Sequence, residues 1–325
     1  MRLLSFNMQY GFGADGVYDL IRAAGVIAGA DIACLQEVDR HWSRSGFDDQ
    51  PGRLTEMLGD RYTVFGPGFD MDASTVVGAR VMNRRRQFGP MVISRWPILW
   101  SRLHLLPLAA MIDPINTQTC ALEACIAAPL GPLRVVSVHL AHVGVGERLA
   151  QIAALKAALV PVGPWSGTDD ELARNWTESL PEPPCPAEML WLGDFNSESG
   201  SVEHRAIVGD TPYHPGALYR GAMVDAVAAL GQRLHTHEKV IAGEVRLRQL
   251  DPVVVLELQV VPGLPRGRHG LQGLRRGGQQ PSSQRGGRDA VHLRRHHGNG
   301  AGRLLVRRSH RTDLAVMLRA RVFSP

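Results

Sequence analysis

Five polar residues at the ends of apolar runs are of the types that phosphate-ester hydrolysis requires. They are Asn7, Glu37, His139, Asp194 and Asn196, in the runs LSFN, CLQE, VSVH and LGDFN. The reaction needs carboxylates for a metal that shields the phosphate, a base that activates water, and donors for the charge that develops on the phosphoryl oxygens. Mg²⁺ favours carboxylates and water, and usually takes one or two carboxylates from a protein. The set therefore offers a candidate for each task.

Each of these residues also has a structural explanation when it is considered alone. Glu37 is compatible with a solvated strand end, His139 with a hydrogen-bonded core histidine, and Asn7 with a turn. Asp194 and Asn196 are also typical of a plain Asx turn. All five at the ends of apolar runs in one chain nevertheless favour an active site on the rim of a β-sheet.

The elements that would position these residues are short apolar strands and amphipathic helices. Because two of the strands with polar ends lie in each half of the first 200 residues, we expect two similar sheets that face each other and are covered by helices. The predicted strands cover residues 1–10, 32–38, 61–66, 90–94, 98–106, 119–128, 132–142, 189–196 and 314–322, and the helices 16–29, 52–58 and 146–159. The predicted fold is an α/β (α+β) four-layer α/β/β/α sandwich of two mixed β-sheets flanked by helices.

Helical spacing of apolar residues supports two of the predicted helices. Asp15 is a candidate N-cap for the helix over 16–29. The expected apolar stripe of the helix over 146–159 consists of Leu149, Ile152, Ala153 and Leu159.

Residues 67–87 carry no clear periodicity and are predicted to form a long loop that ends in three consecutive arginines. These arginines, Arg84 to Arg86, are candidates for contacts with substrate phosphates, although a solvated charge run is the commoner case.

Composition limits the cellular compartment and the binding partners that we expect for this protein. The sequence contains no apolar run of eighteen residues and no signal-peptide pattern at its start, so we expect a cytoplasmic, monomeric protein without stable membrane insertion. The four cysteines, Cys34, Cys120, Cys125 and Cys185, form no CxxC pair and are predicted to be reduced thiols.

The positive charge of the chain belongs to one segment. Residues 263–311 contain twelve arginines and one aspartate, a net charge of 12 − 1 = +11, so the remainder of the chain carries 5 − 11 = −6. This glycine- and arginine-rich segment within a single domain over 1–325 is predicted to be aberrant or disordered. Two hypotheses explain it: an out-of-frame reading of a GC-rich gene, or a genuine basic segment that holds nucleic acid or anionic lipid by charge.

Several segments together resemble the endonuclease/exonuclease/phosphatase (DNase I-like) superfamily. They are LLSFNMQYG from Leu3, DIACLQEVD from Asp31, VISRWPI from Val92, VVSVHLAH from Val135 with Arg148 and Gln151 downstream, and WLGDFNSE from Trp191. The resemblance covers roughly residues 1–230, and LQEV followed by GDFN is its most specific part. It implies a metal-dependent hydrolase of phosphate esters that uses Mg²⁺ or Mn²⁺. The substrate would be a nucleic acid, a phospholipid head group or a small phosphodiester.

The resemblance also implies a role for each residue. Glu37 is similar to the principal metal ligand, and Asn7 to the asparagine that supports the metal and phosphate site. His139 resembles the histidine that contacts a phosphate oxygen. Asp194 resembles the aspartate that orients or deprotonates the attacking water, and Asn196 the asparagine that stabilises the transition state. Asp225 resembles a structural aspartate, with a helix-end carboxylate as the alternative.

The sequence departs from the family pattern near its C-terminus. Asp251 stands where the family has the aspartate that orients a catalytic histidine, but Pro252 follows it, which is unusual in a central strand. Ser309 and His310 resemble a Ser-Asp-His motif without its aspartate. This departure favours an alternative function, that of a catalytically impaired family member that binds a phosphate ligand or partner without turnover.

Overall fold

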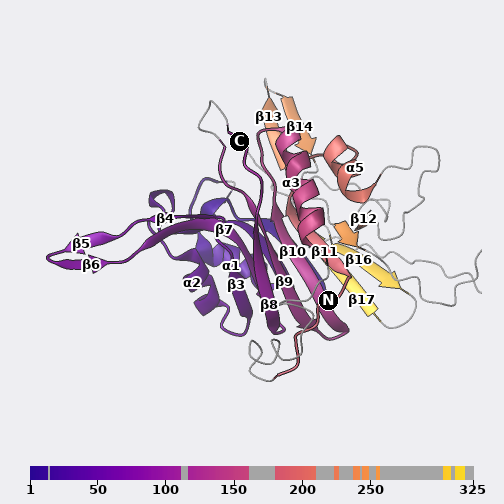
Figure 1. Ribbon diagram of the computed structural model, residues 1–325, viewed down its shortest axis with the longest axis horizontal. Coiled ribbons are helices and arrows are strands. Elements are labelled where there is room, and N and C mark those ends of the chain that lie inside the picture. The colour runs from indigo at the N-terminus through magenta and orange to yellow at the C-terminus, as the bar shows by residue number, and fades with distance from the viewer. Residues whose placement is uncertain are drawn as a thin grey trace, which may run out of the picture.

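The chain folds into two stacked β-sheets with helices on both outer faces, as Figure 1 shows. The computed structural model describes residues 1–13, 15–110, 116–160, 180–209 and 223–226 with their side chains, and further strands after residue 236 by their backbone alone. The predicted α/β/β/α sandwich of two mixed sheets is confirmed.

The first sheet contains β1, β2 and the strands that follow β2. Its strand order is β16-β17-β1-β2-β7-β3. Strand β4, which is not part of this order, also pairs with β7. Strand β1 is parallel to β2 and β17, whereas β7 is antiparallel to β2. The bounds are β1 Arg2–Asn7, β2 Ile32–Arg40, β3 Tyr62–Phe65, β4 Phe69–Asp72, β7 Arg85–Ser94, β16 Arg303–Arg308 and β17 Thr312–Leu318.

The second sheet has the order β12-β15-β11-β10-β9-β8. Strands β10 and β11 are parallel, and β9 pairs with β10 in an antiparallel hairpin. The bounds are β8 Ile98–Leu105, β9 Cys120–Ala128, β10 Gly131–His139, β11 Met189–Asp194, β12 Met223–Asp225 and β15 Val254–Leu256. Two separate hairpins are formed by β5 Thr75–Val77 with β6 Arg80–Met82 and by β13 His237–Ile241 with β14 Glu244–Arg248.

Three apolar clusters hold the layers together. The cluster between the sheets contains Leu3, Cys34, Val135 and Leu192, which are all buried. The helices α1 Leu20–Ala28 and α2 Gln50–Met57 cover the outer face of the first sheet, and α3 Val145–Ala158 and α5 Val202–Val208 cover the second. Two short 3-10 helices, η1 Gln9–Gly11 and η2 Ser43–Ser45, follow β1 and β2.

The start of α1 corrects the predicted cap. The helix begins at Leu20, and the side chain of Asp19, not of Asp15, accepts from the backbone N–H of Arg22. Asp15 instead accepts from the N–H of Val17 and pairs with the Arg22 guanidinium. Asp15 lies on a turn before the helix, so its carboxylate bonds locally, as aspartates in turns do.

The buried face of α3 is more polar than predicted. Ile152 and Leu159 are buried as expected, but Ala153 is exposed and Leu149 is only half-buried. Arg148 and Gln151 take the inward positions instead. The Gln151 side chain accepts from the backbone N–H of Ala141. Arg148 donates to the Ala141 carbonyl and pairs with Glu203. Hydrogen bonds therefore determine which residues of α3 face inward, and the spacing of apolar residues cannot predict those bonds.

The predicted loop over residues 67–87 is wrong. Strands β4 and β7 extend away from the sheet, and β5 and β6 continue them as a ribbon that turns at Gly78 (Figure 1). We call residues 69–86 the arm. A hydrogen bond from Ala73 N–H to the Arg84 carbonyl joins its two parts. Cross-strand hydrogen bonds form this ribbon without a buried face, so the period-two pattern that marks a half-buried strand is absent.

Much of the C-terminal third lies outside the described residues. Within 263–311 the structure describes the strand β16, and the predicted last strand, expected at 314–322, is β17 at Thr312–Leu318. The remainder of the segment for which composition predicts disorder is not among the described residues. All four cysteines are free thiols, as predicted. In the described part of the chain, no helix is long and apolar enough to cross a membrane.

A polar contact crosses between the sheets. The side-chain nitrogen of Gln36 on β2 donates to Ser137 Oγ on β10 at 2.9 Å, and the Ser137 hydroxyl donates to the Leu35 carbonyl at 2.9 Å. Both side chains are buried. Loss of one partner leaves a buried polar group unsatisfied.

We expect Ser137→Ala to lower the free energy of unfolding by about 1–3 kcal/mol, because Gln36 and the Leu35 carbonyl each lose a buried partner. The matched control is Ser101→Ala on β8, where the serine is exposed and we expect a change within about 0.5 kcal/mol. Urea unfolding of both variants measures the difference. Equal stability of the two variants would show that the contact between the sheets contributes nothing.

Candidate active site

Three candidate residues occupy the last inward-facing position of their strands. On β1 the side chains of Leu3, Ser5 and Asn7 alternate toward the second sheet, because successive residues of a strand point to opposite faces. The same alternation places His139 after Val135 and Ser137 on β10, and Asp194 after Leu190 and Leu192 on β11. The apolar members fill the core between the sheets, and the last residues of the three series, Asn7, His139 and Asp194, lie half-buried at its rim.

Glu37 reaches the rim through a β-bulge. The β2–β7 register shifts between Leu35 and Val38, and both of these residues pack in the cluster under α1 and α2. Strict alternation from Leu35 would send Glu37 to that outer face. Glu37 instead adopts φ +58°, and one residue is inserted into the strand. A bulge of this kind redirects a side chain and is frequent next to active sites.

The four side chains converge where the two sheets meet. One ligand atom from each of Glu37, His139 and Asp194 lies within 4.8 Å of the others. The Asn7 amide nitrogen donates to Glu37 Oε1 at 2.8 Å and to Asp194 Oδ2 at 3.0 Å. Its amide oxygen accepts from the Gln9 N–H at 3.1 Å. Asn7 therefore bridges a carboxylate from each sheet, and its amide nitrogen faces both of them.

The turn after β11 fixes Asp194 and Asn196. Asp194 Oδ1 accepts from the Asn196 N–H at 2.9 Å, which makes an Asx turn, and Asn196 has φ +48°. The Asn196 amide nitrogen donates to the Leu140 carbonyl at 2.9 Å and joins this turn to the end of β10. A Cβ on Gly193 would lie 1.9 Å from the Val138 carbonyl oxygen, so only glycine permits this approach of β11 to β10.

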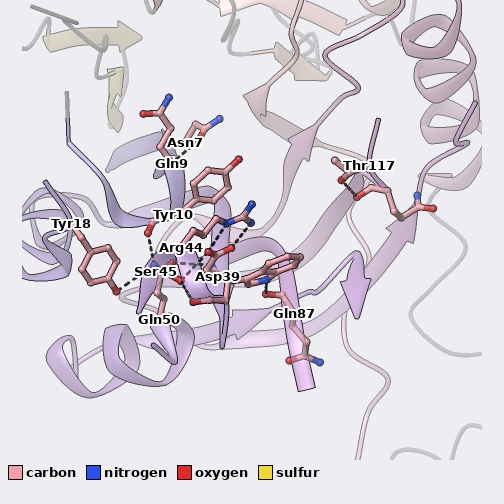
Figure 2. A network of polar contacts seen from close by, with 12 residues as sticks. Asn7, Gln9, Tyr10, Tyr18, Asp39, Arg44, Ser45, Gln50, Gln87 and Thr117 are labelled. Carbon is pink, nitrogen blue, oxygen red and sulfur yellow. Dashed lines mark hydrogen bonds and ion pairs between the residues drawn. The ribbon is translucent and has the colours of Figure 1, made fainter. Parts of the chain in front are cut away.

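An aromatic wall lies beside Glu37. The pKa of the Tyr10 hydroxyl is raised by burial and then by the charge of Glu37, with which it hydrogen-bonds, so Tyr10 stays a neutral donor. Figure 2 shows the Arg44 guanidinium between the Tyr10 ring and Asp39. Arg44 lies 3.6 Å from the ring centroid and pairs with the fully buried Asp39 at 2.8 Å. Phe88 contacts Tyr10 and His139 with ring centroids at 5.9 and 6.4 Å.

Sequence reasoning missed Tyr10, Arg44 and Phe88. Tyr10 lies in η1, where φ is +59°, and Arg44 lies in η2. Neither is at the end of an apolar run. The only sequence signal is position, because Tyr10 follows Asn7 by three residues and Arg44 follows Glu37 by seven.

Not all of the predicted site residues can be placed. Asp251 and His310 lie outside the described residues. Asp225 ends β12, and its Oδ2 lies 2.9 Å from the Nε2 of buried His204 on α5. This contact joins a helix to the second sheet.

The donors in the cluster suit a hard divalent cation. Two carboxylates and one imidazole from two sheets meet at a half-buried rim, and Mg²⁺ and Mn²⁺ favour oxygen donors with waters completing their coordination. Clustered carboxylates repel each other, and a cation between them removes that cost. Glu37 and Asp194 are therefore the candidate ligands, with His139 beside them. Asn7 already donates to both carboxylates and is placed to support them.

The comparison with protein families identifies the family of the chain. The sequence profile of the endonuclease/exonuclease/phosphatase family matches residues 4–226. The chain belongs to this family. Members of the family are generally hydrolases that act on phosphate esters, typically with a divalent metal. No curated protein sequence matches the chain.

Solved structures with a similar arrangement share little sequence identity with the chain. An endonuclease/exonuclease/phosphatase from Beutenbergia cavernae is 21% identical with a TM-score of 0.40, and the match covers 65% of this chain and 49% of that one. A mannosyl-6-phosphatase from Bacteroides thetaiotaomicron is 13% identical with a TM-score of 0.48, covering 78% and 84%. Sphingomyelinase C from Streptomyces griseocarneus is 15% identical with a TM-score of 0.39, covering 78% and 98%. The chain thus spans about half of the Beutenbergia protein.

We expect Mn²⁺ to stabilise the chain against thermal unfolding, by about 2.7 kcal/mol at a hundredfold excess over its dissociation constant. Glu37→Gln and Asp194→Asn should each lose most of this gain, because each removes one charged ligand. The matched control is Glu56→Gln on the exposed face of α2, which should keep it. Thermal melts with Mn²⁺ and with EDTA give the comparison. Equal Mn²⁺ stabilisation in all four proteins would place the metal elsewhere.

Proposed function

We propose that this chain hydrolyses phosphate esters in a reaction that requires Mg²⁺ or Mn²⁺. The observation that supports it best is the cluster of Glu37, His139 and Asp194, held by the Asn7 amide where the two sheets meet. Family membership supports the reaction class, because family members generally hydrolyse phosphate esters. A bound divalent cation would shield the phosphate charge and polarise its oxygens.

The roles of the side chains follow from what each one can donate or accept. Asp194 is the candidate to orient the attacking water and take its proton, since one of its oxygens is fixed by the Asx turn and the other faces Asn7. His139 is the candidate donor to a phosphoryl oxygen, and Phe88 limits the positions of its ring. The Asn196 amide can use its second N–H for the developing charge, because Leu140 occupies only one.

Tyr10 adds a role that the sequence did not indicate. Its neutral hydroxyl donates to Glu37, and Arg44 against its ring limits its movement. Tyr10 and Asn7 therefore both donate to Glu37. Two donors that fix a carboxylate keep the ligand oriented before substrate arrives.

The substrate remains one of three classes: nucleic acid, phospholipid head group or small phosphodiester. Asp251 and His310, to which the resemblance gives the Asp–His pair, remain proposals. If the pair is incomplete, the alternative of a family member that binds a phosphate ligand without turnover gains support, because single acid–base groups contribute about 10²–10⁴-fold in rate.

The direct test is hydrolysis of bis-p-nitrophenyl phosphate with Mg²⁺, with Mn²⁺ or with EDTA. We expect metal-dependent turnover that falls about 10²–10⁴-fold in Asp194→Ala. The control is Asp60→Ala, a 77% exposed carboxylate that pairs only with the neighbouring Arg61 in the described part of the chain. Its activity should equal that of the unmodified chain.

Two results would contradict the proposal. Equal activity in Asp194→Ala would exclude Asp194 from the reaction. No turnover of this diester or of plasmid DNA by a chain that Mn²⁺ still stabilises would favour the binding alternative.

A further inference from the structure

The arm presents aliphatic side chains to solvent on both of its faces. Every residue from Thr75 to Arg85 is exposed. In the register of β5 and β6, Val76 pairs with Val81 on one face. On the other face Val77 pairs with Arg80, and Met82 pairs with Thr75. The exposed fractions of Val76, Val81, Val77 and Met82 are 69%, 56%, 67% and 47%. An aliphatic cluster of this size has no packing role in the described structure, and exposed apolar patches commonly mark interaction sites.

Basic residues accompany the aliphatic tip. The distal part of the arm, residues 73–84, contains Arg80 and Arg84 and no acidic residue. Closer to the sheet, Arg85 is paired with Asp70. The end of the arm is therefore apolar and cationic together, although the chain outside residues 263–311 carries a net negative charge.

We propose that the arm docks this protein onto the surface of an anionic lipid bilayer. The valines would lie at the boundary of the acyl chains, the long Arg80 side chain would extend from the tip back to the phosphate groups, and Arg84 would meet the phosphates farther along the ribbon. A lipid interface surrounds an inserted tip and so covers the aliphatic side chains of both faces at once. Anionic head groups also attract arginines near the surface. The proposal goes beyond the hydrolase function and does not require turnover.

Two other occupants explain less of the arm. A nucleic acid would attract the arginines but leave four aliphatic side chains in water, and the distal part of the arm, residues 73–84, contains no aromatic side chain on which bases could stack. A second copy of the chain packed on the ribbon would cover one face and leave the other exposed. Neither removes Val76 and Val77 from water together.

The arm leaves the same edge of the fold that holds the site. Strand β7 is antiparallel to β2, so its first residues lie beside the end of β2, where Gln87 is opposite Arg40. The Trp42 indole N–H donates to the Gln87 carbonyl at 2.8 Å, and His41 bonds the Arg85 carbonyl at 2.9 Å. From this base to Gly78 the ribbon spans about 30 Å. A docked arm would thus hold the site edge near the lipid surface.

The test is partition of the full chain onto sedimenting vesicles of phosphatidylcholine with or without phosphatidylglycerol. The variant Val76→Thr, Val77→Thr, Val81→Thr keeps side-chain shape, β-branching and charge. We expect it to bind phosphatidylglycerol vesicles at least about tenfold more weakly, because three methyl groups are replaced by hydroxyls. Since charge is unchanged, this loss cannot come from the arginines of residues 263–311.

The matched control is Ile21→Thr with Leu130→Thr, two aliphatic residues that are 71% and 70% exposed outside the arm. Its partition should equal that of the unmodified chain. Arg80→Gln with Arg84→Gln should reduce the preference for phosphatidylglycerol about fivefold for each arginine. Circular dichroism checks that each variant is folded.

Three results would overturn the proposal. They are no vesicle binding by the unmodified chain, equal binding by the threonine variant, or an effect of the threonine variant on self-association or oligonucleotide binding alone. Because partition is measured without substrate, its outcome is independent of whether the chain is a hydrolase.

Discussion

The hydrogen bonds of Ser137 with Gln36 and with the Leu35 carbonyl are the constraint on which the site depends. They join β2 to β10 across the core, one residue before Glu37 and two residues before His139. A buried amide and hydroxyl have few alternative partners, so these bonds fix the register of one sheet on the other. A shift of one residue in a strand would turn its polar end toward the opposite face. This register keeps Glu37 and His139, the polar ends of β2 and β10, at the same edge of the core.

The site concentrates negative charge and supports it with neutral donors. The Asn7 amide and the Tyr10 hydroxyl both face Glu37, and Asn7 also reaches Asp194. Hydrogen bonds from uncharged groups orient carboxylates without neutralising them. The positive charge of Arg44 is directed to Asp39 and the aromatic wall. The carboxylates at the rim therefore stay available to a cation.

Sequence reasoning located the residues that obey strand alternation. Asn7, His139 and Asp194 end apolar runs, and period two alone places them on the inner face. Glu37 was also found, but the bulge that redirects it has no signal in the run CLQEV. The sequence predicts Asp15 as the N-cap of α1, whereas the structure has Asp19. Both are polar residues ahead of an apolar stripe, and only the backbone conformation distinguishes them.

Sequence patterns missed the features that no apolar periodicity marks. The arm has no half-buried strand pattern because no core orders its side chains, and Tyr10 and Arg44 lie in short 3-10 helices. The polar inner face of α3 is set by hydrogen bonds to the backbone of Ala141. Because Ala141 lies outside the helix, the spacing of residues within the helix does not predict these bonds. Predictions for Asp251 and His310 concern residues outside those that the structure describes.

The most direct test of this account is a crystal of the chain grown with Mn²⁺ and examined by anomalous scattering. We expect one manganese peak contacted by Glu37 from the first sheet and by Asp194 or His139 from the second. A peak bound by residues of one sheet alone, or no peak at this edge under saturating Mn²⁺, would contradict the claim that the stacked sheets build a shared metal site.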